Sequence, residues 1–280
     1  MSPTDRFPDP DKAGVVRSRL GKFYQGSHVI FRGHDLHAEL KDWSWFELNL
    51  FGITGRRFTA AQLRLLEAIW VYTSYPDARI WNNRVAALAG SARSTFTLGV
   101  AAALAVSEAT IYGGGILRRA IDFYLRTKAG MDAGESLEAC IHAELEARRI
   151  IPGFGRPLVN GDERNPRILA LAGELGLDQG PHLKLALAVE DYLYNGRWRV
   201  KMNYGGLTAA LAADLGLSAA EFHAYWFSAF QGGMPPCYLD AAAHGEGSLF
   251  ALPCSQVAYE GEPPRAWKPR RTLQDTGGVG

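Results

Sequence analysis

The 280-residue sequence predicts a mainly α-helical protein. Apolar residues recur at helical spacing through most of the chain, whereas strand-like alternation is limited to residues near 28–31. The sequence contains no series of hairpins, no regular alternation of strands with helices and no internal repeat, so we expect neither a sandwich nor a parallel sheet. With 47% hydrophobic and 21% charged residues, the chain can form one large domain or a large and a small one.

The N-terminal part predicts a leader, one hairpin and two helices. Residues 1–14 are rich in Pro and Asp, and we expect them to be a flexible leader. A small hairpin is expected near residues 22–31, before a turn at residues 32–35. Helices should follow over residues 44–50 and from Thr59, because Thr favours the N-cap position and apolar residues follow it at helical spacing.

The middle of the chain predicts three further helices. Residues 82–105 carry small and apolar residues in one long helical pattern, so a single helix is expected there. Small residues that would let a second helix approach it closely are Gly90, Ser91 and Ala92. The three glycines at 113–115 interrupt the pattern, and helices are expected over residues 116–127 and after the N-cap candidate Ser136.

The C-terminal part predicts four more helices and then an irregular tail. The expected helices cover residues 166–176, 181–194, 206–215 and 219–231. Glycines suited to the C-cap position are Gly176, Gly196 and Gly216. From about Gly232 the periodicity is lost, and residues 260–280 are expected to form an arm outside the core.

Charge and length exclude several function classes. The net charge of +1 and the pI near 7.8 imply no strong field, so we expect neither a nucleic-acid partner nor a membrane surface. The alanine-rich run at residues 99–106 is far shorter than the roughly 20 residues that cross a bilayer.

The cysteines and histidines predict no disulfide framework and no metal site. Three cysteines without paired short spacing fit a reducing, cytoplasmic setting, and Cys140 lies on an apolar helix face that predicts a core position. His34 and His37 are three residues apart, but no third ligand is evident, so we expect no metal.

Five short motifs occur in one order along the chain. They are Arg32-Gly33-His34-Asp35-Leu36 with Glu39-Leu40; Arg84 to Ser91 with Ser94-Thr95; Tyr112-Gly113-Gly114-Gly115; Pro152-Gly153-Phe154-Gly155-Arg156 with Arg167; and Asn203-Tyr204-Gly205-Gly206. In order and spacing they resemble the motifs of the citrate synthase and citryl-CoA lyase family in its short form. The resemblance implies an all-α fold with a large helical domain (15–113 and 213–280) and a small domain (114–212) that carries the CoA-binding loop.

The resemblance also implies a type of reaction, but this sequence differs from the family at the three catalytic positions. Such enzymes join or split a C–C bond between an acetyl-CoA-like thioester and a 2-oxo acid, with a carboxylate as base and two His as donors. Here these positions hold Tyr112, Arg156 and Gly205. A tyrosine hydroxyl can still donate to an enol oxygen, and an arginine can hold a carboxylate or oxo group, but glycine cannot act as a base.

Positions that the resemblance assigns to binding are kept better. Those implied for CoA are Pro152, Gly153, Phe154, Gly155, Arg199 and Lys201, the last two pointing the same way if their segment is extended. Those implied for the second substrate are Arg167, which matches a carboxylate-binding Arg, and Asn203. Phe230 or Gln231 stands where a further Arg is expected, which weakens the expectation of oxaloacetate as substrate.

From the residues alone, each of these positions also has a simple structural interpretation. Tyr112 can cap a helix before a glycine turn, Arg156 can be a surface residue of a loop, and Arg199 and Lys201 can be a solvated pair.

Two hypotheses for function follow. The first is a homodimeric enzyme that acts on an acyl-CoA and a carboxylic or 2-oxo acid, with CoA thioester as substrate and no tightly bound cofactor. The second is a non-catalytic relative that keeps the fold and serves as a partner or regulatory subunit.

Overall fold

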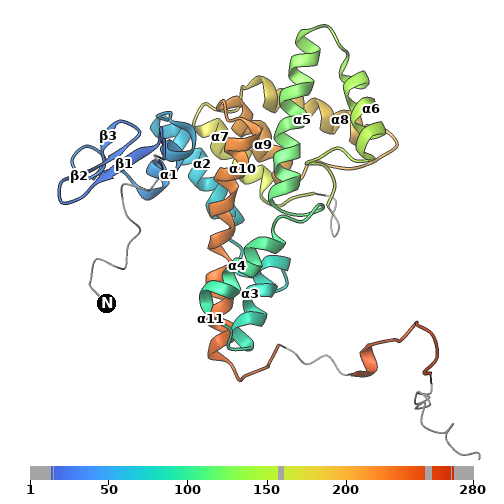
Figure 1. The fold of residues 1–280 in the computed structure, drawn as a ribbon. Helices are drawn as coiled ribbons and strands as arrows, with labels where there is room; N and C mark the ends of the chain where they lie inside the picture. Colours follow the sequence, from blue (N-terminus) through green and yellow to red (C-terminus); the bar gives the residue numbers. More distant parts are fainter. Residues whose placement is uncertain (1–13, 15, 157–160, 250–253, 266, 268–280) are drawn as a thin grey trace, which may run out of the picture.

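The computed structural model describes residues 14, 16–156, 161–249, 254–265 and 267. Within this part the chain is mainly helical, as the sequence predicts, with one small sheet (Figure 1). The α-helices are α1 (Trp45–Thr54), α2 (Ala60–Thr73), α3 (Trp81–Ser91), α4 (Phe96–Val106), α5 (Gly114–Asp132), α6 (Leu137–Arg148), α7 (Asn165–Glu174), α8 (Pro181–Asn195), α9 (Tyr204–Asp214), α10 (Ala219–Ala229) and α11 (Met234–Ala243). Two short 3-10 turns are η3 (Phe230–Gly232) and η4 (Cys254–Gln256).

The sheet lies beside α1 and is antiparallel in the order β1 (Gly21–Tyr24), β2 (His28–Phe31), β3 (His34–Asp35). The predicted hairpin is therefore confirmed, and the turn at residues 32–35 adds a third strand to it. Arg32, at φ 46°, donates two hydrogen bonds of 3.1 and 2.7 Å to the carbonyl oxygen of Gly52. This contact fixes the sheet to the last turns of α1.

The first two helices begin at the predicted caps. The hydroxyl of Ser44 accepts a hydrogen bond from the backbone N–H of Glu47 at 3.1 Å. Thr59 and Gln62 form a reciprocal capping box at the start of α2. In both cases a local side chain satisfies a backbone donor that the helix leaves unpaired, which is why the sequence predicts these ends well.

Helix α9 is the centre of the main helical body. Nine of its residues are buried, and α5 and α8 pack directly against it. A run of Ala, Gly and Leu without charge before Asp214 suits a helix that is surrounded by others. The N-terminus of this central helix is where the candidate site is built.

The expectation of one helix over residues 82–105 is wrong. The chain forms α3 and α4 with a left-handed residue, Arg93 (φ 58°), between them. The guanidinium of Arg93 donates to the carbonyl oxygens of Ala242 and His244, the latter at 2.8 Å, at the end of α11. These bonds to a distant helix end favour the break.

The expectation that regular structure ends near Gly232 is also wrong. Helix α11 continues the direction of α10 and packs on α3 and α4 in a three-helix unit that projects from the main body (Figure 1). A Cβ on Gly90 would collide with the carbonyl oxygen of Tyr238, so α11 approaches α3 as closely as the small residues predicted. The signal that was missed is the spacing of the buried Met234, Cys237 and Ala241.

Two further predictions concern helix ends and the core. Gly176 and Gly216 follow their helices with φ of 67° and 78°, as expected for C-terminal glycines, whereas Gly196 ends α8 in an extended conformation. The core position predicted for Cys140 is wrong, because its half-buried thiol donates to Glu135 at 3.3 Å while Ile141 takes the inner position.

The predicted domain division stays a prediction. The leader lies outside the described residues except for Gly14, and of the expected arm the described residues 260–265 are exposed.

Candidate functional site

The glycine-rich loop that follows α6 is seated on the N-terminus of α9. Asn203 donates from its backbone N–H to the carbonyl oxygen of Gly153 at 2.9 Å, and from its side chain to that of Gly155, also at 2.9 Å. The N–H of Gly155 donates to the carbonyl oxygen of Lys201 at 2.8 Å, and Phe154 and Met202 form an antiparallel bridge. The sequence-predicted CoA loop and the predicted basic segment are therefore direct neighbours.

Two glycines make this close approach possible. Gly153 has φ 90°, and a Cβ there would lie 2.6 Å from the Cα of Gly206. Asn203 also caps α9, since its Oδ1 accepts from the N–H of Gly206 at 3.0 Å. Pro152 and Gly153 are buried by this packing, while Phe154 and Gly155 stay half-buried. Only the second half of the loop therefore offers surface to a ligand.

The basic pair lies on the exposed edge of this loop. Both Arg199 and Lys201 are exposed, and the ammonium of Lys201 lies 4.9 Å from the ring centre of Tyr194. The premise that the segment is extended is wrong at Arg199, whose φ is 54°. The two side chains therefore need not point the same way, although both flank the loop.

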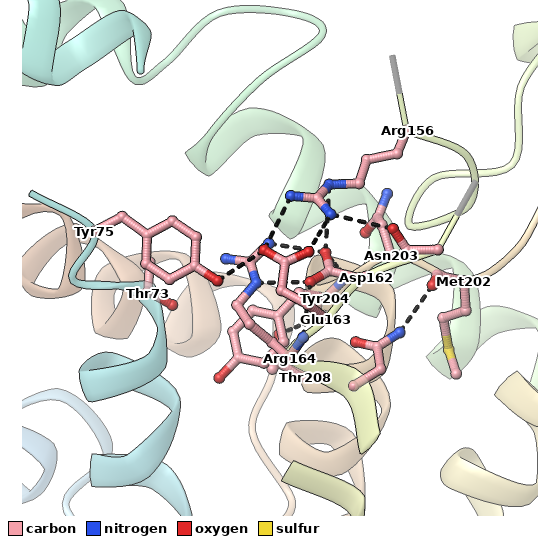
Figure 2. A network of polar contacts seen from close by, with 12 residues as sticks. Thr73, Tyr75, Arg156, Asp162, Glu163, Arg164, Met202, Asn203, Tyr204 and Thr208 are labelled. Carbon is pink, nitrogen blue, oxygen red and sulfur yellow. Dashed lines mark hydrogen bonds and ion pairs between the residues drawn. The ribbon is translucent and has the colours of Figure 1, made fainter. Parts of the chain in front are cut away.

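A cluster of charged residues follows directly after the loop (Figure 2). Nη1 of Arg156 donates to Glu163 Oε2 at 2.6 Å and to the carbonyl oxygen of Gly161 at 3.1 Å, and its Nε lies 3.7 Å from Asp162 Oδ2. Glu163 also accepts from the hydroxyl of Tyr75 at 2.9 Å. Arg156 is thus held inside a network and does not extend as an isolated surface side chain.

The buried centre of this cluster is the pair of Asp162 and Arg164. Both carboxylate oxygens of Asp162 accept from Arg164 at 2.8 Å, and its Oδ2 also accepts from the backbone N–H of Tyr204 at 3.0 Å. The guanidinium of Arg164 lies 4.3 Å from the ring centre of Tyr204 and 5.2 Å from that of Tyr75. Two aromatic rings, a carboxylate and the start of α9 therefore converge on one arginine.

The cluster keeps its carboxylates ionised. Burial disfavours the charge of Asp162, but the hydrogen bonds and positive charge of Arg164 outweigh it, so the pKa of Asp162 lies below its usual value. Hydrogen bonds from Arg156 lower the pKa of Glu163 to about 2. The same contact raises the pKa of Arg156 above its usual value. At neutral pH Asp162, Glu163 and Arg156 therefore carry their charge.

Tyr112 stands just before the glycine turn that opens α5. Its hydroxyl donates to Oδ1 of Asn82 at 2.9 Å, and its ring lies 4.9 Å from that of Trp81. Burial raises the pKa of Tyr112 to about 12, and the positive charge of Arg164 acts in the opposite direction. The tyrosine is therefore a neutral hydrogen-bond donor at any physiological pH, and it lies within the electrostatic reach of the charged cluster.

The position to which the sequence resemblance assigns the base offers no carboxylate. Gly205 lies in the first turn of α9, and a Cβ there would be 2.6 Å from Leu117 Cδ2 and 3.2 Å from Asn203 Oδ1. A side chain at residue 205 would thus need Leu117 to move. Asp162 lies nearby at the start of the same helix, but it is committed to Arg164 and to the N–H of Tyr204.

The remaining predicted residues lie at separate places. Arg167 is exposed on α7. Phe230 is buried, with its ring 5.9 Å from that of Trp226. Gln231 lines an open hollow of about 490 Å³ together with Trp45 and Trp70. The structure therefore joins the loop, Arg156 and Asn203. It does not bring Arg167, Phe230 and Gln231 into the same contact network.

Arg164 and Tyr75 are the residues that sequence reasoning missed. The signal for Arg164 was present, because it stands two positions after the acidic Asp162 and three before Arg167, the arginine that was chosen instead. Tyr75 carried no signal, because it reaches Glu163 across 88 positions of sequence.

Neither a metal centre nor a membrane span is found in the part that the structure describes. No group of three or more His, Cys, Asp or Glu residues there is arranged to hold a metal ion. Among the same residues, every helix falls short of the length and apolarity that crossing a bilayer requires.

Solved structures identify the fold. Citryl-CoA lyase from Hydrogenobacter thermophilus superposes with a TM-score of 0.78 at 21% identity, over 91% of this chain and 98% of that one. ATP citrate lyase from Methanothrix soehngenii, solved with citrate and coenzyme A, gives 0.72 at 16% identity over 93% of this chain but only 43% of that chain. Citrate synthase from Thermotoga maritima gives 0.62 at 18% identity, over 82% of this chain and 61% of that one.

Comparisons of sequence alone found no relative. No protein-family model matches the chain, and no curated protein matches it in sequence. At these identities the structural likeness establishes the fold: the chain has the helical citrate-synthase-like architecture.

Proposed function

We propose that this protein, whose fold is that of citrate synthase and citryl-CoA lyase, binds an acyl-CoA thioester and forms or cleaves a C–C bond at an atypical site. The reaction would be of Claisen or retro-Claisen type, in an acyltransferase or lyase. The observation that carries the proposal is the direct pairing of the Phe154 loop with the segment of Arg199 and Lys201 at the start of the central helix. In the resembling family these two elements bind CoA.

Each part of the site has a role in this proposal. The half-buried Phe154 and Gly155 face the adenine end of CoA, while Arg199 and Lys201 meet its phosphates. The hydroxyl of Tyr112, which is neutral and half-buried, turns from Asn82 Oδ1 to the oxygen on which enolate charge develops and donates its one proton there. Arg156, with Asn203 and Arg167 as further candidates, faces the second substrate, a carboxylic or 2-oxo acid.

Coenzyme A binding is the first test. CoA or acetyl-CoA should raise the melting temperature of the protein, because a ligand that binds only the folded state stabilises it. Replacing Arg199 and Lys201 together by Ala should remove most of that rise, whereas Lys184→Ala, at an exposed position on α8, should not. Absence of a shift with every thioester tested would refute the proposal.

Catalysis needs a separate test. In deuterated water the enzyme should exchange the methyl protons of acetyl-CoA, or the α-protons of another acyl-CoA, which mass spectrometry detects. Tyr112→Phe should slow this exchange because the donor to the enolate oxygen is lost. Arg156→Ala should leave exchange less affected but weaken binding of the carboxylic or 2-oxo acid.

One observation favours the second candidate, a non-catalytic partner or regulatory subunit. Gly205 leaves the base position without a carboxylate, and Leu117 occupies the space beside it. A protein of this kind would bind CoA in the first test and show no proton exchange with any acyl-CoA in the second.

A homodimer and a cytoplasmic setting are part of the proposal. Helix α4 has no charged residue, and it exposes Leu98, Ala101, Ala102, Ala105 and Val106 on one unit with α3 and α11. An exposed apolar helix face of this kind suits a second copy of the chain. Light scattering should give about twice the monomer mass, and Leu98→Glu should yield monomers. Cys140 and Cys237 are unpaired thiols, which fits a reducing compartment.

A further inference from the structure

Arg156, which the proposed function turns toward the second substrate, already holds a carboxylate of its own chain. Glu163 accepts from Nη1 of Arg156 at 2.6 Å and from Nη2 at 3.4 Å, and it also accepts from the hydroxyl of Tyr75 at 2.9 Å (Figure 2). One guanidinium and one tyrosine hydroxyl around a carboxylate are the donors that a protein would offer to a carboxylic acid substrate.

The net charge of the cluster also indicates that Glu163 takes the place of a substrate carboxylate. Arg156 and Arg164 contribute two positive charges, and the ionised Asp162 and Glu163 contribute two negative ones. Asp162 is buried and neutralises Arg164, so the charge on Arg164 is not offered to a ligand. The cluster is electrically balanced before any substrate arrives, so each ligand carboxylate adds one uncompensated negative charge, and a dicarboxylate adds two.

We infer that Glu163 is a specificity-determining residue: it occupies Arg156 as an internal carboxylate, so that the second substrate carries at most one carboxylate. The inference rests on the proposed function for the placement of Arg156 at the substrate. It names the substrate class of that site as neutral or monoanionic carbonyl compounds, and it excludes dicarboxylates such as oxaloacetate. The side chain of Glu163 is 57% exposed, so its removal leaves no buried cavity.

The test is to measure binding of small acids by isothermal titration calorimetry to the full chain, with and without coenzyme A. The wild-type protein should bind oxaloacetate and malonate no more tightly than pyruvate. Glu163→Gln keeps the size of the side chain and one acceptor oxygen, but it removes the charge and the second acceptor. It should bind both dicarboxylates about tenfold more tightly, because Arg156 is then released from an anion, while the affinity for pyruvate changes by less than about twofold.

Three further variants assign the gain to Arg156. Glu174→Gln removes the same charge from an exposed position at the end of α7 and should change nothing. Adding Arg156→Gln to Glu163→Gln should abolish the gain, as expected of two residues in direct contact. Tyr75→Phe removes one donor to Glu163 and should give a smaller gain of the same sign, so the inference remains testable if Glu163→Gln does not fold.

The outcomes separate this inference from the proposed function. Tighter binding of dicarboxylates than of pyruvate by the wild-type protein, no gain in Glu163→Gln and Tyr75→Phe, or an equal gain without Arg156 would each overturn the inference. A gain in Glu163→Gln that depends on Arg156, in a protein that binds no thioester, would uphold the role of Glu163 and refute the proposed function.

Discussion

Two pairs of residues in this molecule are alike in sequence and in local geometry but not in surroundings. Asp77 and Arg79, like Asp162 and Arg164, are two positions apart and form a bidentate ion pair through Nε and Nη2, at 3.1 and 2.6 Å in the first pair and 2.8 and 2.8 Å in the second. The side chains of the first pair are 36% and 90% exposed, whereas those of the second are 1% and 19% exposed.

The difference teaches that a motif acquires its role from what packs around it. The first pair closes a surface turn before α3. The second caps α9 through Tyr204 and carries the charged cluster on which the proposed site depends. An exposed ion pair contributes little to stability, whereas a buried carboxylate that loses its partner is strongly destabilising.

The largest expected effect tests this contrast directly. Arg164→Ala should lower the free energy of unfolding by about 4 kcal/mol, because it leaves the carboxylate of Asp162 buried without its cation. Arg79→Ala should have a much smaller effect, because water replaces the lost partner of Asp77. Urea unfolding followed by circular dichroism measures both. Equal costs would mean that burial does not distinguish the two pairs.

A second matched pair applies the same contrast to glycine. Gly153 and Gly134 have similar left-handed φ values of 90° and 98°, but a Cβ on Gly153 would meet Gly206, whereas one on Gly134 would meet no atom within 4 Å. Gly134→Ala should cost about 1 kcal/mol for the backbone conformation alone. Gly153→Ala should cost about 3 kcal/mol, because the collision is added. The comparison fails if both variants unfold at the same urea concentration.

The third effect concerns pH. The pKa of Glu163 falls from its ordinary 4.5 to about 2 in the folded protein. Its contribution is therefore complete above about pH 5 and is lost as the pH falls toward 2. Because the side chain is largely exposed, we expect about 1 kcal/mol or less. Unfolding measured at pH 7 and pH 3 should show a smaller acid loss in Glu163→Gln than in the wild type, and an unchanged loss would place the titration elsewhere.

The smallest expected effect on stability is that of replacing the half-buried Tyr112. Tyr112→Phe should lower stability by less than about 1 kcal/mol, because Oδ1 of Asn82 keeps its bond from the N–H of Asn83 and the ring still packs on Trp81. The wild-type tyrosine should ionise near pH 12, above its ordinary value of 10. Phenolate absorbance should therefore differ between the two proteins mainly above pH 11; a difference near pH 10 would show that Tyr112 is more exposed than the structure indicates.

Much of the fold could be predicted because its signals are local. Ser44, Thr59 and Ser136 cap helices through hydrogen bonds within three residues, and the hairpin at residues 21–31 pairs neighbouring segments. The division of residues 82–105 into two helices could not be predicted, because it depends on bonds from Arg93 to the distant end of α11. Helix α11 itself was missed although its buried residues are spaced as in a helix.

The candidate site divides in the same way. By itself the sequence predicted the glycine loop at residues 152–155, because its glycines favour a loop conformation. It assigned Asn203 to the second substrate, and only the structure shows that this residue caps α9. Only the tertiary structure decided that Arg164 is at the centre of the cluster, and that Glu163 neutralises Arg156. The physical reason is that the strength of a charge pair depends on its burial and its neighbours, and both are set by segments far apart in the sequence.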